Sequence, residues 1–131
     1  MKKIDFWGRD ENDERLLEEV VAGLKTATCT PKVWYNRLPE DEKSQIGDYF
    51  QACTKQGVPR AVIIIIDVYE IPFGEIKGKI GQRIAEGENC TLEEYIKDHI
   101  SCWEEPLESE GHGFGDHTII VVEHFKIVSA E

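Results

Sequence analysis

The sequence predicts an α+β protein of one domain, in which helices flank a mixed or antiparallel β-sheet. Two helices are indicated, over residues 12–22 and from residue 91 to about 103. Strands are indicated at 48–54 and 59–69, joined as a hairpin, and at 117–128 near the end of the sequence. Helices interspersed with hairpin-linked strands are typical of the α+β class. A chain of 131 residues has the length of one domain with its own core.

The first helix has a recognisable start, face and end. Asn12 or Asp13 can cap it. Its apolar positions recur at helical spacing on one face, and they are Leu16, Leu17, Val20 and Val21. Gly23 supplies the left-handed residue that ends many helices. The segment 24–30 contains Thr-Ala-Thr-Cys-Thr, which favours an extended chain, so a strand is expected there.

The centre of the chain holds the most apolar strand. Residues 31–44 form a polar segment that predicts either a loop or one short helix. Residues 55–57 end in glycine and predict a turn into the strand 59–69. The run 61–66 is apolar on both faces, so this strand is expected in the middle of the sheet.

The last third of the chain predicts helical structure followed by a final strand. Residues 78–87 indicate a short helix or turn. Thr91 and Glu94 have the spacing of a capping box at the start of the second helix. Pro106 is expected to end that helix, and an acidic, glycine-rich loop at 108–115 is expected to follow.

The charge of the chain narrows the classes of partner. Acidic residues outnumber Lys and Arg by 26 to 15, for a net charge of −11. Nucleic acids are bound mainly through basic side chains on phosphates, so a DNA duplex is not an expected partner. A small neutral or cationic substrate remains compatible with this charge, and a local basic groove stays possible within an acidic protein.

The compartment is predicted from the absence of export and membrane signals. Lys2 and Lys3 precede acidic residues instead of an apolar run, so no signal peptide is expected. The longest apolar run, 61–66, is too short to span a bilayer, and no membrane partner is expected. The four cysteines are widely spaced and are predicted to be free thiols. A cytoplasmic protein is the expectation.

The side chains of Lys25, Thr28 and Glu88 are of three types that together can support hydrolysis. A threonine hydroxyl is a weak nucleophile until a base takes its proton. A lysine can be that base only when it is neutral, and a carboxylate can orient the lysine or move protons. The alternative is structural, because a Lys–Glu pair is usually a surface salt bridge that contributes less than about 1 kcal/mol.

Other residues complete the candidate site. Glu86 and Glu88 flank Gly87, so one carboxylate lies in a cleft or both belong to a solvated turn. Trp34 and Tyr35 lie in a polar segment and could stack on a planar ring. Four potential metal ligands show no established zinc spacing, namely His99, Cys102, His112 and His117. No metal and no cofactor are therefore expected.

Several motifs in order along the chain resemble those of the ASCH-domain family of the PUA-like superfamily. Residues 23–28, Gly-Leu-Lys-Thr-Ala-Thr, resemble its G-x-K-T-x-T signature, and residues 45–49 resemble its Gly-Asp strand entry. Residues 85–92 resemble its second acidic motif, and residues 121–128 resemble its closing strand. The resemblance covers nearly all of residues 1–131 as one domain and implies a small β-barrel with flanking helices.

The resemblance also implies two kinds of function. Some members are RNA-binding modules or ribonucleases, and one bacterial branch hydrolyses N4-acetylcytidine with a lysine, a threonine and a glutamate. The motifs carry those roles to Lys25, Thr28 and Glu88, with Thr26 and Glu86 as flanking substrate contacts. The implied partner is a nucleoside or nucleotide, with a single-stranded RNA end as the alternative. Residues 31–45 and 104–116 are additions to the compact branch, and Thr30 replaces its arginine.

Overall fold

The structure is a computed structural model that describes residues 1–6 and 12–130. Its elements, in chain order, are β1 (Lys2–Ile4), α1 (Arg15–Val21), β2 (Ala27–Pro31), α2 (Lys32–Tyr35), β3 (Tyr49–Cys53), β4 (Pro59–Pro72), α3 (Gly78–Gly87), α4 (Leu92–Ser109) and β5 (Ile119–Ala130). Two 3-10 turns, Glu40–Glu42 and Phe73–Glu75, lie in the connections.

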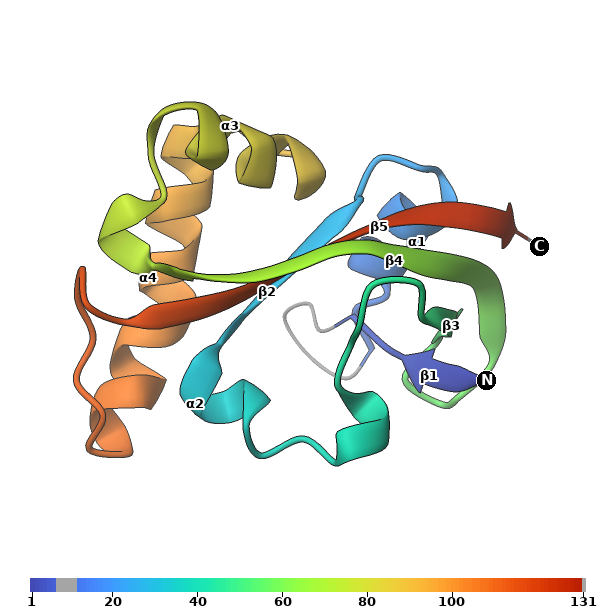
Figure 1. Ribbon diagram of the computed structural model, residues 1–131, viewed down its shortest axis with the longest axis horizontal. Coiled ribbons are helices and arrows are strands. Elements are labelled where there is room, and N and C mark those ends of the chain that lie inside the picture. The colour runs from blue at the N-terminus through green and yellow to red at the C-terminus, as the bar shows by residue number, and fades with distance from the viewer. Residues whose placement is uncertain (7–11, 131) are drawn as a thin grey trace.

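The five described strands form one mixed sheet in the order β1-β3-β4-β5-β2. β1 pairs with β3 in parallel, and the other neighbours are antiparallel. β4 and β5 are long strands that cross the whole molecule (Figure 1). The prediction of an α+β fold with a mixed sheet is confirmed, and the apolar strand β4 lies at the centre of the sheet as expected.

Two hydrophobic clusters lie on opposite faces of this sheet. One packs α3 and α4 against β4 and β5, and its fully buried side chains include Ile84, Leu107 and Ile120. The other packs α1 against β3, β4 and β5, and includes Leu17 and Phe125. Figure 1 shows the two groups of helices toward opposite ends of the long strands. β2 lies at one edge of the sheet. One side of its backbone pairs with β5, and the other side pairs with no described strand.

Three helix and strand boundaries differ from those predicted. The first helix begins at Arg15, and Asp13 accepts a hydrogen bond from the Arg15 backbone N–H just before it. The strand expected at 24–30 is β2, which starts only at Ala27. Pro106 lies inside α4 and does not end it, because the next residue, Leu107, is fully buried and anchors another helical turn in the core. A proline in a helix removes one hydrogen bond, which this packing offsets.

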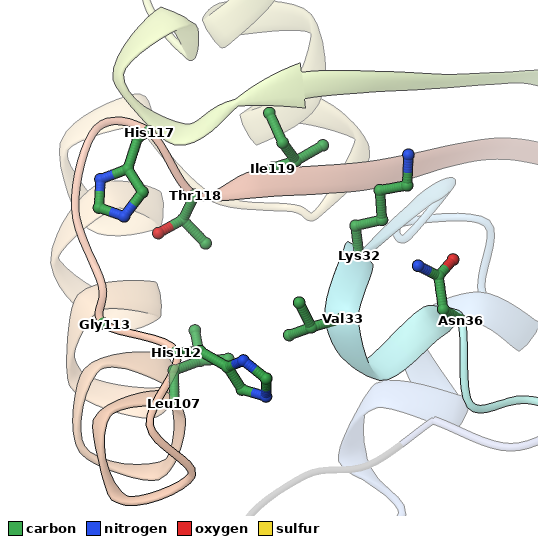
Figure 2. A pocket seen from close by; sticks show the side chains of 9 residues that line it. All are labelled: Lys32, Val33, Asn36, Leu107, His112, Gly113, His117, Thr118 and Ile119. Carbon is green, nitrogen blue, oxygen red and sulfur yellow. The ribbon is translucent and has the colours of Figure 1, made fainter.

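Segments 31–45 and 104–116, which the resemblance marks as additions, contact each other. Trp34 of α2 donates a hydrogen bond from Nε1 to Oε1 of Glu110, at 3.1 Å, and Arg37 forms an ion pair with the same carboxylate. Between them lies a pocket of about 240 Å³, with apolar lining from Val33, Leu107 and other side chains (Figure 2). Among the described residues, no helix has both the length and the apolar character that a membrane crossing requires.

Candidate functional site

Lys25 and Glu88 form an ion pair that is almost withdrawn from solvent. Nζ of Lys25 lies 3.0 Å from Oε1 of Glu88, and the two side chains are 2 % and 12 % exposed. The same Nζ donates a second hydrogen bond to the Ala27 backbone carbonyl, at 2.6 Å. Of the residues that the sequence predicts for the site, the structure brings these two together across 63 positions of chain.

Lys25 is placed by the end of α1 and the start of β2. Gly23 adopts a φ of +77°, as the sequence predicts for a helix end. The Lys25 backbone N–H donates to the Glu19 carbonyl in the last turn of α1. The next residue, Thr26, donates to the Gly87 carbonyl at 2.6 Å and accepts from the Phe125 N–H. Thr26 therefore joins α3 to the sheet through its backbone.

Glu88 is held by the helix end of α3. The Cys90 N–H donates to the Ala85 carbonyl and the Asn89 N–H to the Glu86 carbonyl, the two bonds of a Schellman motif. Asn89 takes the left-handed position with a φ of 59°. Glu88 is thus the last residue before the turn, and its carboxylate points back toward β2. Glu86, its neighbour in the predicted pair, is exposed.

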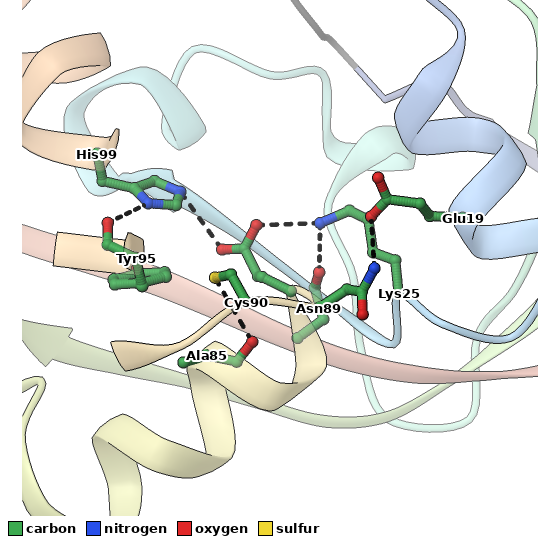
Figure 3. Close-up of polar contacts among 9 residues, drawn as sticks. Glu19, Lys25, Ala85, Asn89, Cys90, Tyr95 and His99 are labelled. Carbon is green, nitrogen blue, oxygen red and sulfur yellow. Dashed lines mark hydrogen bonds and ion pairs between the residues drawn. The ribbon is translucent and has the colours of Figure 1, made fainter. Parts of the chain in front are cut away.

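Side chains of α4 surround the second oxygen of Glu88. Nε2 of His99 lies 3.4 Å from Oε2, and Nδ1 of His99 lies 2.7 Å from the Tyr95 backbone oxygen. The His99 ring stacks on Tyr95 and contacts Trp103. Among the described residues, neither Oε2 of Glu88 nor the hydroxyl of fully buried Tyr95 has a hydrogen-bond partner. Figure 3 shows the line of contacts from Lys25 to His99.

The burial of Cys29 and Tyr95, together with the nearby Glu88 carboxylate, keeps these two side chains uncharged. Burial raises the pKa of the Cys29 thiol well above its usual value, and the charge of Glu88 adds to the shift. Burial also raises the pKa of Tyr95, with smaller contributions from Cys29 and Glu88. A thiol that stays protonated is a poor nucleophile, so Cys29 lines the site and is not its reactive group.

Cys29, Tyr95 and His99 belong to this site but were not predicted as members of it. His99 was considered only as a metal ligand. The available signal was that Tyr95 and His99 are four residues apart and share a helix face. That spacing predicts a shared face, but it does not predict that α3 delivers a carboxylate to it.

Thr28 lies on β2 beside the ion pair but is not hydrogen-bonded to it. Within the described part of the chain, its side chain has no hydrogen bond to Lys25 or Glu88. Cys29 packs toward α3 and α4, and side chains alternate along a strand, so Thr28 faces the opposite side of the sheet. Its partner across the strand pair is Glu123. Thr28 directly follows Ala27, whose carbonyl accepts a hydrogen bond from Lys25. Thr28 is therefore close to the Lys25–Glu88 ion pair along the chain.

Glu123 is a buried carboxyl on the Thr28 face of the sheet. It is 5 % exposed, and its Oε2 is hydrogen-bonded to Oγ of Ser44. The Ser44 backbone N–H in turn donates to the Tyr35 hydroxyl at 2.8 Å. Burial raises the pKa of Glu123, and the bond from Ser44 lowers it by less. A buried carboxyl with few partners resists ionisation.

Replacing Glu123 with glutamine is expected to stabilise the fold near pH 7. A carboxyl whose folded pKa is raised contributes stability below its unfolded pKa and loses it as the pH rises through the folded pKa. The gain from Glu123→Gln should therefore shrink as the pH falls toward 4, as measured by melting temperature against pH. Glu104→Gln, at an exposed position of α4, is the control. A stabilisation equal at both pH values would contradict this account.

The two aromatic residues predicted to stack on a ring have different surroundings. Trp34 packs partly against the core under α4 and bonds to Glu110. Tyr35 lines a second pocket, of about 470 Å³, between the segment 35–45 and the sheet. Val68 and Val121 form part of its floor, on the same sheet face as Thr28. Neither of the two pockets is lined by Lys25 or Glu88.

A metal does not explain the cluster around Glu88. No group of three or more His, Cys, Asp or Glu side chains within the described ranges could hold a metal ion. All four cysteines are free thiols, as predicted. The donors that converge on the Glu88 carboxylate are an ammonium and an imidazole, which move or stabilise charge on organic groups.

The fold and site together define a small α+β domain with a buried Lys–Glu pair at the edge of a mixed sheet. The model of the ASCH domain matches residues 3–129, so the chain belongs to the ASCH domain family. The resemblance inferred from the motifs is confirmed. ASCH domains are associated with RNA binding and with hydrolysis. No curated protein matches the chain.

Two solved structures with this fold have low sequence identity to the chain. The chain is similar to protein EF3133 from Enterococcus faecalis V583, with a TM-score of 0.74 and 22 % identity over all of this chain and 82 % of that one. It is also similar to an ASCH domain from Lactobacillus crispatus JV V101, with a TM-score of 0.77 and 23 % identity over 95 % of this chain and 77 % of that one. At these identities the likeness supports the fold and not the substrate.

Proposed function

We propose that this protein is a small-molecule amidohydrolase that acts on an acylated nucleoside such as N4-acetylcytidine. The observation that carries the proposal is the buried Lys25–Glu88 pair, whose second carboxylate oxygen faces the imidazole of His99 at 3.4 Å. A buried ion pair costs desolvation. Such a pair is better explained by a reaction than by stability.

In the proposed reaction, the hydroxyl oxygen of Thr28 attacks the acyl carbon while a water molecule carries its proton to the carboxylate of Glu88, because Thr28 faces the other side of the sheet from the α4 side chains. Lys25 places its positive charge beside the oxyanion of the tetrahedral intermediate. The C–N bond then breaks, and the leaving nitrogen takes the proton from Glu88. Water hydrolyses the resulting ester, which releases the acid and restores the Thr28 hydroxyl. The contacts support the stabilising role for Lys25, because its Nζ is the positive member of an ion pair with Glu88 and an ammonium has no lone pair for a base.

Charge and pocket size support a nucleoside over a polynucleotide. The chain carries a net charge of −11, which disfavours a long phosphate backbone. The pocket lined by Tyr35 has a volume of about 470 Å³, which falls in the range of small-molecule sites. The Tyr35 ring and the amide side chains of Asn36 and Gln45 offer a stacking surface and hydrogen bonds to a base.

Replacing Thr28 with alanine is expected to lower the turnover of N4-acetylcytidine by at least about 100-fold, because the nucleophile is lost. Release of cytidine, followed by chromatography, measures the effect. Thr28→Ser keeps a hydroxyl and should retain part of the activity. Thr30→Ala is the matched control, since Thr30 lies two residues further on the same face of β2. Equal activity of Thr28→Ala and the folded wild type would exclude Thr28 as the nucleophile.

A nucleotide-binding module without chemistry is the second candidate. The observation that favours it is that Lys2 and Lys43 line the same pocket as Tyr35, together with Glu40 and Glu70, so two ammonium groups lie where a phosphate could contact them. This candidate is supported if the wild type binds cytidine monophosphate without hydrolysing acylated nucleosides. Affinity that falls steeply with salt would then indicate phosphate contacts and single-stranded RNA, whereas salt-independent binding would indicate the nucleoside.

A further inference from the structure

We infer that His99 is a positioning residue for Glu88. Its imidazole shares a proton with Oε2 of Glu88 and exchanges that proton with solvent. This inference rests on the proposed function for its catalytic consequence but on geometry for the pairing itself. His99 is the third member of a line of charged and polar groups in which Glu88 lies between Lys25 and the imidazole.

The contacts of His99 determine which of its nitrogens carries a proton. Nδ1 lies 2.7 Å from the Tyr95 backbone oxygen, and a carbonyl oxygen only accepts hydrogen bonds. Nδ1 therefore carries a proton, and in the neutral ring Nε2 has a lone pair. Nε2 faces Oε2 of Glu88 at 3.4 Å, and two lone pairs at that distance repel each other. One proton must lie between them, either on the imidazole or on the carboxyl group.

The packing holds the imidazole in this orientation. The ring of His99 stacks on Tyr95 with centroids 4.0 Å apart, and it contacts Trp103 at 4.6 Å. His99 is 19 % exposed, whereas Glu88 is 12 % and Lys25 is 2 % exposed. Of these three groups, the imidazole is thus the one with most access to water, and it provides the route by which a proton at Glu88 reaches solvent.

The proton balance in the reaction is simple. The proton already shared by Nε2 and Oε2 is the one that Oε2 delivers to the leaving nitrogen when the C–N bond breaks. The proton of the nucleophile, carried by water, takes its place between Oε2 and Nε2. No net proton is gained or lost by the pair in the acylation step, and Nδ1 keeps its proton throughout. His99 acts through Glu88 and does not touch the substrate.

Nitrogen NMR of the histidine rings tests the pairing without any substrate. We expect the Nδ1 signal of His99 to be that of a protonated nitrogen, and the Nε2 signal to shift on Glu88→Gln. The signals of His117, which lies in the loop before β5, should not move in that variant and serve as the control. An unprotonated Nδ1, or an Nε2 signal that ignores Glu88→Gln, would overturn the inference whether or not the protein hydrolyses amides.

Turnover tests the role in the reaction. His99→Ala is expected to lower kcat by at least about 10-fold with KM within about two-fold, because proton transfer is affected and binding is not. Added imidazole should restore part of kcat in His99→Ala but leave the wild type and His117→Ala unchanged. His99→Gln, which keeps a donor near Oε2, checks that the loss does not come from misfolding. Unchanged kcat in a folded variant, or no recovery with imidazole, would contradict the relay.

Discussion

Replacing Lys25 with methionine is expected to abolish hydrolysis and to lower the free energy of unfolding by about 3 kcal/mol. Methionine fills much of the same volume but leaves the Glu88 carboxylate without its cation, in a position that is 12 % exposed. It also leaves the Ala27 carbonyl without the donor that lies 2.6 Å away. The cost comes mainly from the buried charge that remains, and not from the bond that is lost.

Urea denaturation of Lys25→Met and of the wild type measures this cost. The matched control is Lys32→Met, because Lys32 forms an ion pair with Glu70 at the same 3.0 Å but with side chains 41 % and 52 % exposed. Its expected loss is under about 1 kcal/mol. Adding Glu88→Gln to Lys25→Met should recover part of the stability, since the unpaired charge is then absent. If the double variant is as unstable as Lys25→Met alone, the ion pair is not the source of the loss.

Local signals were sufficient to predict both ends of this site. Gly23 ends α1 in the left-handed conformation, and Thr91 with Glu94 forms the capping box that starts α4. Each depends on residues within one turn of helix, where backbone chemistry alone decides the structure. The motif resemblance then selected Lys25 and Glu88, and the structure places them 3.0 Å apart.

The remaining features depend on contacts between distant segments. Pro106 is tolerated in α4 because Leu107 is buried in the core, which no local pattern encodes. His99 joins the site only because α3 ends beside α4. The relation of Thr28 to Glu123 follows from the register of β2 with β5, which is set by pairing across almost the whole chain. Such tertiary relations override local propensity.

Replacing Gly87 with alanine is expected to reduce activity by at least about 10-fold through the position of Glu88, although residue 87 itself has no functional group. A Cβ at Gly87 would lie 2.5 Å from Cβ of Ala27, a separation that real methyl groups do not adopt. The end of α3 would have to move away from β2. That movement lengthens the 2.6 Å bond between the Thr26 N–H and the Gly87 carbonyl, and it draws Glu88 from Lys25.

The size of the effect follows from two opposed contributions to stability. Alanine is a better helix former than glycine by up to about 1 kcal/mol, whereas overpacking a core contact costs about 1 to 3 kcal/mol. A modest net loss of stability is therefore expected together with a larger loss of activity. Gln82→Ala is the control on the same helix, because Gln82 is exposed, and it should change neither quantity by much.

The contact itself can be tested by removing the other methyl group. Ala27→Gly deletes the Cβ that the new side chain at residue 87 would meet, so the variant Ala27→Gly/Gly87→Ala should recover much of the activity lost in Gly87→Ala. Ala27→Gly alone should be nearly as active as the wild type, because Ala27 contributes its carbonyl to Lys25 and not its side chain. Recovery in the double variant would show that the close approach of α3 to β2 holds the carboxylate on the lysine. If the double variant is no more active than Gly87→Ala, the effect comes from the helix end and not from this contact.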